Sequence, residues 1–289
     1  MQDVKNMKAV IIAAGYGTRF LPCSKTIPKE MFPLIDTPAI DLIIDELAAS
    51  GIKDILIVTS RRKKVLEDYF DREIELETFF KSKNDNAKLA QILPENLNIF
   101  FVRQKEMQGT GHALLICKEF IGNDSFIVAY PDDIVFSSIP LSKQLIDIHN
   151  NTGESVLAVQ EIEGDVSRYG VIDYEKAGDT LKVNKIIEKP AKGIEPSKMI
   201  SVGRYLFTSE LLTLLEDEFK SHKDGEFYHI GAINKLAAKN KMFACKYSGE
   251  RMDIGDKCGY IDAIIKYGLE RQDLKNQVKD IILKYSKSN

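Results

Sequence analysis

The sequence contains no tryptophan, and it has only four cysteines and four histidines among its 289 residues. Cys23, Cys117, Cys245 and Cys258 are far apart and form no Cys-x-x-Cys pair. This spacing argues against a cysteine-rich zinc site and against a disulfide framework, and it predicts reduced thiols.

The sequence also lacks any apolar run of 18 residues, so we expect no membrane span. Its first seven residues, MQDVKNM, are largely polar and lack the apolar centre of a signal peptide. Together with the reduced thiols, these absences predict a cytoplasmic protein.

The sequence also has no large excess of positive or negative charge. The formal net charge is −3 and the pI is about 5.9, which argues against general binding to nucleic acid or to anionic membranes. With 44% apolar and 29% charged residues, the chain has the composition of an ordinary globular protein. Its length allows one large α/β domain or two small ones.

The most informative stretch is residues 8–33, KAVIIAAGYGTRFLPCSKTIPKEMFP. A short β-branched run predicts a buried strand, and Gly15 and Gly17 follow it directly. Glycines let successive backbone N–H groups approach an anion, and Arg19, Lys25 and Lys29 add three cations nearby. The stretch matches neither common phosphate-loop motif. It therefore predicts a polyphosphate site, the alternative being a tight turn whose basic residues are merely solvated.

Strands and helices alternate through the first half of the chain. Apolar runs predict strands over residues 55–59, 99–103, 126–129 and 155–160, and helical periodicity appears over residues 38–50, 110–119 and 141–150. Residues 61–97 are charged and helical, and we interpret them as an insertion. This alternation predicts an α/β fold with a Rossmann-like, mostly parallel sheet flanked by helices, and ligands at the carboxyl ends of the strands.

The pattern changes after residue 168. Short predicted strands at residues 171–173, 181–188 and 200–207 suggest small antiparallel additions, followed by helices over 209–218, 229–240 and 258–267. Residues 272–286 form an amphipathic tail that we expect to pack on the body or on a partner subunit. We expect a single domain over residues 1–289, with halves at 8–160 and 161–257 and C-terminal helices at 258–289.

The stretch AAGYGTRFLPxSKTIPKEMFPLIDTP resembles the signature of the sugar-1-phosphate nucleotidylyltransferases, and it is most similar to their bacterial UTP–glucose-1-phosphate uridylyltransferase branch. The resemblance implies a nucleotide-diphospho-sugar transferase fold. It also implies transfer of a uridylyl group from UTP to glucose 1-phosphate, giving UDP-glucose and pyrophosphate. The helical insertion beginning near residue 61 resembles the same branch.

Such a reaction needs no protein nucleophile, because a phosphate monoester is already largely an anion at pH 7. It needs cations and alignment, since two polyanions must meet. By the resemblance, Arg19 and Lys29 contact the triphosphate, and Lys189 binds the phosphate of the sugar. These three residues and two aspartates, Asp132 and Asp253, are the predicted catalytic set.

Magnesium prefers one or two carboxylates together with waters and phosphate oxygens. Asp132 follows a buried strand, and Asp253 lies in the stretch RMDIG. Either residue alone is typical of a turn or a helix cap. By the resemblance both are metal ligands, so the predicted cofactor is Mg²⁺ held by Asp132 and Asp253, with Asp133 near the substrate.

The amide of Gln104 can pair with the edge of a pyrimidine, and by the resemblance Gly109 and Gly111 let the backbone approach the base. His112 is assigned to positioning, because the reaction requires no base. The resemblance implies the following residues around base, triphosphate and sugar: Ala13, Ala14, Gly15, Gly17, Thr18, Glu30, Gln104, Gly109, Asp133, Gly170, Glu188, Lys189, Gly203 and Arg204.

Two alternatives stay open at this point. One is the same chemistry with another nucleotide or another sugar 1-phosphate, and the other is an inactive regulator that binds sugar nucleotides. Two departures from the family pattern fall on the sugar side, namely Ile230-Gly231 in place of a Thr-Asp pair and the RMDIG stretch itself. A homo-oligomer, either dimer or tetramer, is expected.

Overall fold

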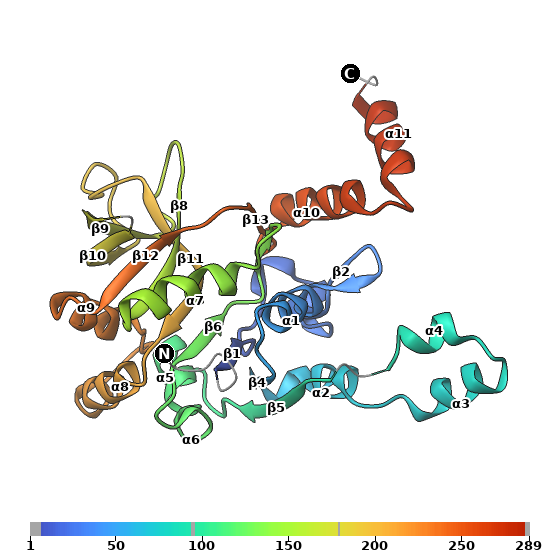
Figure 1. Ribbon diagram of the computed structural model, residues 1–289, viewed down its shortest axis with the longest axis horizontal. Helices are drawn as coiled ribbons and strands as arrows, with labels where there is room; N and C mark the ends of the chain where they lie inside the picture. Colours follow the sequence, from blue (N-terminus) through green and yellow to red (C-terminus); the bar gives the residue numbers. More distant parts are fainter. Residues whose placement is uncertain (1–6, 94–95, 179, 287–289) are drawn as a thin grey trace.

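The fold is organised around one nine-stranded sheet (Figure 1). The computed structural model describes residues 7–93, 96–178 and 180–286. From one edge to the other, the strands are β5 (Asn98–Arg103), β4 (Asp54–Thr59), β1 (Lys8–Ile12), β6 (Phe126–Ala129), β11 (Met199–Phe207), β8 (Ser155–Glu161), β12 (Met242–Lys246), β10 (Thr180–Glu188) and β9 (Gly170–Ala177).

The sheet is mixed. Strands β5, β4, β1 and β6 are parallel, as predicted, and β12 is parallel to β8. Strand β11 is antiparallel to both β6 and β8, and β9 and β10 form an antiparallel pair at the far edge. The α/β class is confirmed, and the predicted antiparallel additions are strands of the main sheet itself.

Helices cover both faces of the sheet. One face packs against α1 (Ala39–Ala49), α7 (Leu141–Thr152) and α10 (Lys257–Glu270), and the other against α5 (Thr110–Leu115), α6 (Lys118–Ile121), α8 (Glu210–Ser221) and α9 (Ile230–Ala238). Helix α1 shows why, because Ile40, Ile43, Ile44 and Leu47 recur at helical spacing and are all buried. The single helix predicted over residues 110–119 is divided into α5 and α6.

The predicted insertion consists of the helices α2 (Lys64–Phe70), α3 (Ile74–Ser82) and α4 (Asn86–Ala90). Figure 1 shows α3 and α4 standing away from the body of the molecule. Glu77 of α3 is buried, and Arg72 and Lys81 neutralise its carboxylate at N–O distances of 2.6 and 3.2 Å. These ion pairs allow the carboxylate of Glu77 to be buried within the projecting α3–α4 segment.

The C-terminal helix α11 (Lys275–Ser286) also projects from the body, beyond the end of α10 (Figure 1). None of its described side chains is buried. Ile281, Leu283 and Tyr285 are each more than half exposed. Across the described ranges of the chain, no helix combines the length and apolar character that a membrane span requires.

Two short ribbons complete the fold. Strand β2 (Pro33–Leu34) pairs with β3 (Thr37–Pro38), and β7 (Asp133–Phe136) pairs antiparallel with β13 (Glu250–Asp253). The sequence pattern did not predict the second ribbon. It joins segments that are more than 100 residues apart, and it lies beyond the carboxyl end of β6.

Candidate active site

The ribbon of β7 and β13 brings the two predicted metal-binding aspartates together. Asp133 of β7 is directly opposite Asp253 of β13 in the register of this pair. The ribbon is extended by one backbone hydrogen bond, from the Ile254 N–H to the Asp132 carbonyl oxygen at 2.9 Å. Asp132 and Asp253 therefore lie side by side although 120 residues separate them in the sequence.

Gly255 marks the point on which the predicted charged groups converge. A Cβ atom at this position would lie 2.9 Å from Asp253 Oδ1, 3.0 Å from Asp132 Oδ2 and 3.3 Å from Arg19 Nη1. Arg19 Nη1 also donates to the Gly255 carbonyl oxygen at 3.3 Å. A residue with a side chain would push these groups apart, so glycine lets the two carboxylates and Arg19 approach one another. Gly255 was not among the residues predicted from the sequence, although its place two residues after Asp253 was a usable signal.

Lys29 is the counter-ion of Asp132. It lies in the 3-10 helix η4 (Lys29–Met31), and its ammonium forms an ion pair with Asp132 Oδ2. Burial opposes the ionisation of Asp132, but Lys29 outweighs it and lowers the pKa of the Asp132 carboxyl. The pKa of Lys29 is raised, because Asp132 and Glu30 offset the effect of its own burial. Both groups are thus held in their charged forms.

Asp133 is engaged by the protein rather than open to a ligand. Its Oδ2 accepts a hydrogen bond from the Gly203 N–H at 2.8 Å, and its Oδ1 pairs with Arg251. Burial raises the pKa of Asp133 to about 6, with Arg251 opposing this shift and Asp132 and Asp253 adding to it. A Cβ at Gly203 would lie only 2.4 Å from Asp133 Oδ2. Asp133 and Gly203 therefore join β7 to β11 behind the aspartate pair.

The predicted sugar-side residues gather at the start of β9 and the end of β10. Gly170 is opposite Glu188, and a Cβ on Gly170 would lie 3.1 Å from Glu188 Oε2. Lys189 follows in a left-handed backbone conformation, with φ at 46°, and its N–H donates to the Tyr169 carbonyl oxygen. Its side chain is 64% exposed and lies 3.8 Å from Glu188 Oε1. This uncommon backbone conformation presents the ammonium to solvent beside Glu188.

The glycine-rich loop follows β1 as predicted. Ala13 and Ala14 are buried, whereas Gly15 and Thr18 are exposed. Gly17 adopts the left-handed conformation, with φ at 65°, immediately before the 3-10 helix η2 (Thr18–Phe20). This conformation is costly for a residue with a side chain.

Glu30 was predicted to lie around the base and ribose, but its carboxylate points inward and is only 1% exposed. Both its oxygens accept hydrogen bonds from Lys63 Nζ at 2.8 Å. The same ammonium donates to the Ala13 carbonyl oxygen. Lys63, which was not predicted as a site residue, therefore connects the end of β1 to the helix that carries Lys29. Its signal in the sequence is a lysine shortly after a buried strand.

Gln104 lies at the end of β5 and is 4% exposed. Its Nε2 donates to the Gly109 carbonyl oxygen at 3.0 Å and lies 3.1 Å from His112 Nδ1. Packing within the protein also requires glycine at two positions of this turn. A Cβ at Gly109 or Gly111 would collide with the backbone or ring of Phe227, at 2.5 and 2.7 Å. The absence of a side chain at Gly109 and Gly111 therefore allows Phe227 to pack against this turn.

Arg204 was predicted to bind substrate, yet its side chain is only 1% exposed. Its Nη2 lies 2.9 Å from Glu46 Oε2 of α1, on the helix-covered side of β11. A contact with substrate would require this buried ion pair to open, so we leave Arg204 out of the proposed site.

The departure at Ile230-Gly231 has a local explanation. A Cβ on Gly231 would lie 2.7 Å from Glu218 Oε2, so a carboxylate from α8 occupies the space of any side chain at this position. Glu218 is paired with Lys235 at 2.9 Å. The glycine of α9 thus accommodates an ion pair between α8 and α9.

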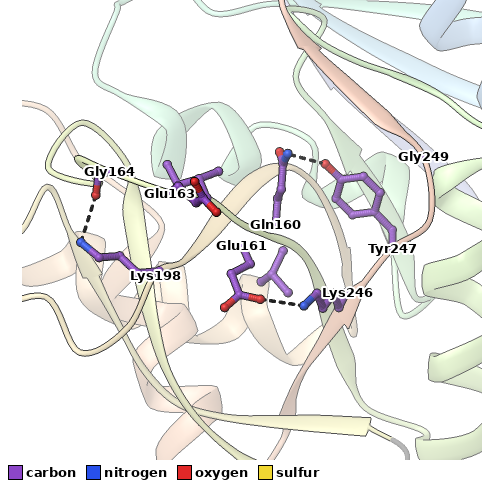
Figure 2. Close-up of a pocket in the computed structure, with 10 residues that line it drawn as sticks. Gln160, Glu161, Glu163, Gly164, Lys198, Lys246, Tyr247 and Gly249 are labelled. Carbon is purple, nitrogen blue, oxygen red and sulfur yellow. Dashed lines mark hydrogen bonds and ion pairs between the residues drawn. The ribbon is translucent and has the colours of Figure 1, made fainter.

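A separate hollow of about 700 Å³ lies where β8 and β12 end (Figure 2). Several of its charged and polar groups already have partners. Lys246 Nζ contacts Glu161 at 2.8 Å, Lys198 Nζ donates to the Gly164 carbonyl oxygen, and Tyr247 points toward Gln160. None of the predicted site residues lines it. The candidate site is therefore the cluster around Gly255 and not this hollow.

The cluster fits a divalent cation bound jointly by protein and phosphate. Within the part of the chain that the structure describes, no three ligating side chains come together. Two carboxylates come together, because oxygens of Asp132 and Asp253 both lie beside Gly255. Two carboxylates completed by phosphate oxygens and waters are the donor set that Mg²⁺ prefers.

The Lys63–Glu30 pair generates a prediction about stability. Replacing one member of a buried ion pair leaves an uncompensated charge, so Lys63→Met should lower the free energy of unfolding by about 3–5 kcal/mol. Urea denaturation followed by circular dichroism measures this. The matched control is Lys220→Met, which removes an exposed pair with Asp217 and should change stability by less than about 1 kcal/mol. Equal effects in both variants would contradict a structural role for Lys63.

Comparison with known proteins identifies the family of the chain. The family model described as "Nucleotidyl transferase" matches residues 8–269. The UTP–glucose-1-phosphate uridylyltransferase of Staphylococcus epidermidis is 42% identical over 286 residues, covering 98% of each chain. The UTP–glucose-1-phosphate uridylyltransferase 2 of Staphylococcus saprophyticus is 41% identical over 288 residues, covering 98% of this chain and 99% of the relative.

Solved structures give the same result. A UTP-bound UGPase from Acinetobacter baumannii superposes with a TM-score of 0.87 at 35% identity, over 96% of this chain and 98% of that one. A UDP-glucose pyrophosphorylase complexed with UDP-glucose has a TM-score of 0.80 at 35% identity, over 92% and 99%. The converging charged groups, the sheet around them and these full-length matches lead to one conclusion: the chain belongs to the nucleotidyl transferase family.

Proposed function

We propose that this protein transfers a uridylyl group from UTP to glucose 1-phosphate, releasing pyrophosphate. The observation that carries the proposal is the convergence of Asp132, Asp253 and Arg19 around Gly255. Relatives named UTP–glucose-1-phosphate uridylyltransferase, and structures bound to UTP or UDP-glucose, support the choice of substrates. The single domain would carry the whole reaction.

In the proposed reaction, an oxygen of the sugar phosphate attacks the α-phosphorus of UTP. A new P–O bond forms as the bond to the bridging α–β oxygen breaks, and the electron pair leaves with pyrophosphate. The nucleophile is already an anion, so no side chain needs to accept a proton. What the protein must supply is alignment and positive charge.

Each charged residue has a place in this scheme. Asp132 and Asp253 would hold Mg²⁺, which when bound would neutralise phosphate charge between the two substrates. Arg19 and Lys29 face the same space from the glycine-rich loop and would bind the triphosphate. Lys189, exposed beside Glu188, would bind the sugar phosphate, with Glu188 accepting hydrogen bonds from sugar hydroxyls.

The position of Lys29 suits the proposed binding of the triphosphate. Its ammonium neutralises Asp132 in the structure as it stands. When a divalent cation and a triphosphate are bound, the carboxylate has another counter-ion and the ammonium has phosphate oxygens within reach. Lys63 and Glu30 would hold the loop in place without touching substrate.

The base would lie against the turn that contains Gln104 and Gly109. The thymidylyl, cytidylyl and adenylyl alternatives share the chemistry and differ only at this turn and on the sugar side. A cytoplasmic location remains a prediction from the sequence.

The substrate assignment predicts the outcome of a pyrophosphate-release panel. UTP, dTTP, CTP and ATP are each paired with glucose 1-phosphate and with other hexose 1-phosphates, in the presence of Mg²⁺. UTP with glucose 1-phosphate should give the highest kcat/KM. Turnover with another pair at a higher rate would reassign the substrates, and no turnover in any pair would exclude the enzyme.

The metal assignment predicts that Asp132→Asn and Asp253→Asn each lower kcat by about 100-fold or more while the protein stays folded. Each should also weaken Mn²⁺ binding to the protein–UTP complex, measured by electron paramagnetic resonance. Gly255→Ala fills the same space without changing a ligand, and it should lower kcat to a similar extent.

The matched control for these variants is Asp217→Asn, an exposed aspartate of α8. It should keep wild-type kcat and Mn²⁺ binding within experimental error. Near-wild-type rates in both Asp132→Asn and Asp253→Asn would show that the metal is held elsewhere.

We also propose that the exposed apolar residues of α11 pack on a second copy of the chain. Ile281, Ile282 and Tyr285 lie within about one helical turn and are 55%, 37% and 66% exposed, so α11 presents a contiguous apolar surface of the kind that marks an interaction site. The double variant Ile281→Asp/Tyr285→Asp should shift the protein to a smaller species in sedimentation velocity. Asn276→Asp/Gln277→Asp adds the same charge at polar positions and should leave the assembly intact. A wild-type monomer would contradict the proposal.

A further inference from the structure

The amide of Gln104 has both of its N–H groups committed within the protein. One faces the Gly109 carbonyl oxygen at 3.0 Å, and the other faces His112 Nδ1 at 3.1 Å. A primary amide has two N–H donors and one carbonyl acceptor. Among the described residues, no donor is recorded on the Gln104 carbonyl oxygen, which is therefore the atom left for a ligand.

The opposite orientation of this amide would be unfavourable. Rotating it by half a turn would place its carbonyl oxygen against the Gly109 carbonyl oxygen and the His112 ring nitrogen, both of which are acceptors. The side chain is 4% exposed, so water could not readily compensate. The Gly109 carbonyl oxygen can only accept a hydrogen bond. His112, by contrast, accepts at Nδ1 only when its ring is neutral and carries the proton on Nε2.

The surroundings of His112 favour the neutral form of its ring and hold the ring in place. Its ring packs on Phe219 of α8 with centroids 5.7 Å apart. Burial lowers the pKa of His112, which favours the neutral imidazole. The turn itself is fixed by two hydrogen bonds, from Phe227 N–H to Gln108 and from Gly111 N–H to Phe227, at 2.7 and 2.8 Å.

We propose that His112 is a positioning residue that makes Gln104 present a hydrogen-bond acceptor to the base, and that this selects uracil over cytosine. Uracil carries an N–H donor at N3, whereas cytosine carries an acceptor there. A fixed carbonyl oxygen therefore pairs with the first and is repelled by the second. This inference rests on the proposed function, because it assigns the base to the turn of Gln104.

The test is the ratio of kcat/KM for UTP to kcat/KM for CTP, with glucose 1-phosphate and Mg²⁺ held constant. His112→Phe keeps the ring and its packing but removes the acceptor. Only the Gly109 carbonyl oxygen then distinguishes the two orientations of the amide, and one N–H of the native orientation loses its partner, so the ratio should fall by roughly tenfold or more. His112→Asn offers a carbonyl oxygen in place of Nδ1 and should restore much of the lost ratio.

His222→Phe is the matched control, since His222 packs on the same Phe219 without contacting Gln104. It should keep the wild-type ratio. An unchanged ratio in His112→Phe, or an equal fall in His222→Phe, would overturn the proposal. If His112→Phe does not fold, His112→Ala provides the same measurement. Failure of the proposed function is distinguishable, because the wild type would then not use UTP at all.

Discussion

The site depends on placing three carboxylates together and keeping them charged or paired. Asp132, Asp133 and Asp253 meet where the β7–β13 ribbon crosses the carboxyl end of β6. Repulsion among them would oppose folding if each lacked a partner. Lys29 neutralises Asp132, and Arg251 contacts both Asp133 and Asp253. The result is a site that retains two carboxylates for a cation, whereas Asp133, whose pKa burial raises, is used to fasten the ribbon to β11.

The mixed sheet explains how substrates can meet there. The parallel strands β1, β4 and β5 end at the glycine-rich loop, at Lys63 and at Gln104, so the triphosphate and base side is built from strand ends. The antiparallel strand β11 then carries Gly203 past Asp133 and pairs with β9, which brings Gly170 and Glu188 toward the same edge. Glycine occurs at Gly203 and Gly255 because a Cβ at either position would lie within about 3 Å of a site carboxylate oxygen.

Much of this arrangement could be predicted from the sequence, and what could not be predicted has identifiable causes. The β1 strand, its glycine loop and the position of Asp132 after β6 follow from local patterns and from a long family signature. The convergence of Asp132 and Asp253 depends on the register of two strands more than 100 residues apart, which no local pattern encodes.

The same limit applies to Arg204 and Glu30, which the sequence predicted to bind substrate. Both are buried against partners, Glu46 and Lys63, that lie on other elements. Gly109 has a recognisable turn signal, but its neighbour Phe227 is known only once the chain is folded.

The most direct test of the account is the location of a divalent cation in a crystal of the protein with UTP and Mn²⁺, measured from the anomalous scattering of manganese. The account predicts a manganese peak bound by carboxylate oxygens of both Asp132 and Asp253 and by the triphosphate, with the Lys29 ammonium moved from Asp132 to a phosphate oxygen. A bound triphosphate whose manganese contacts neither aspartate would contradict it.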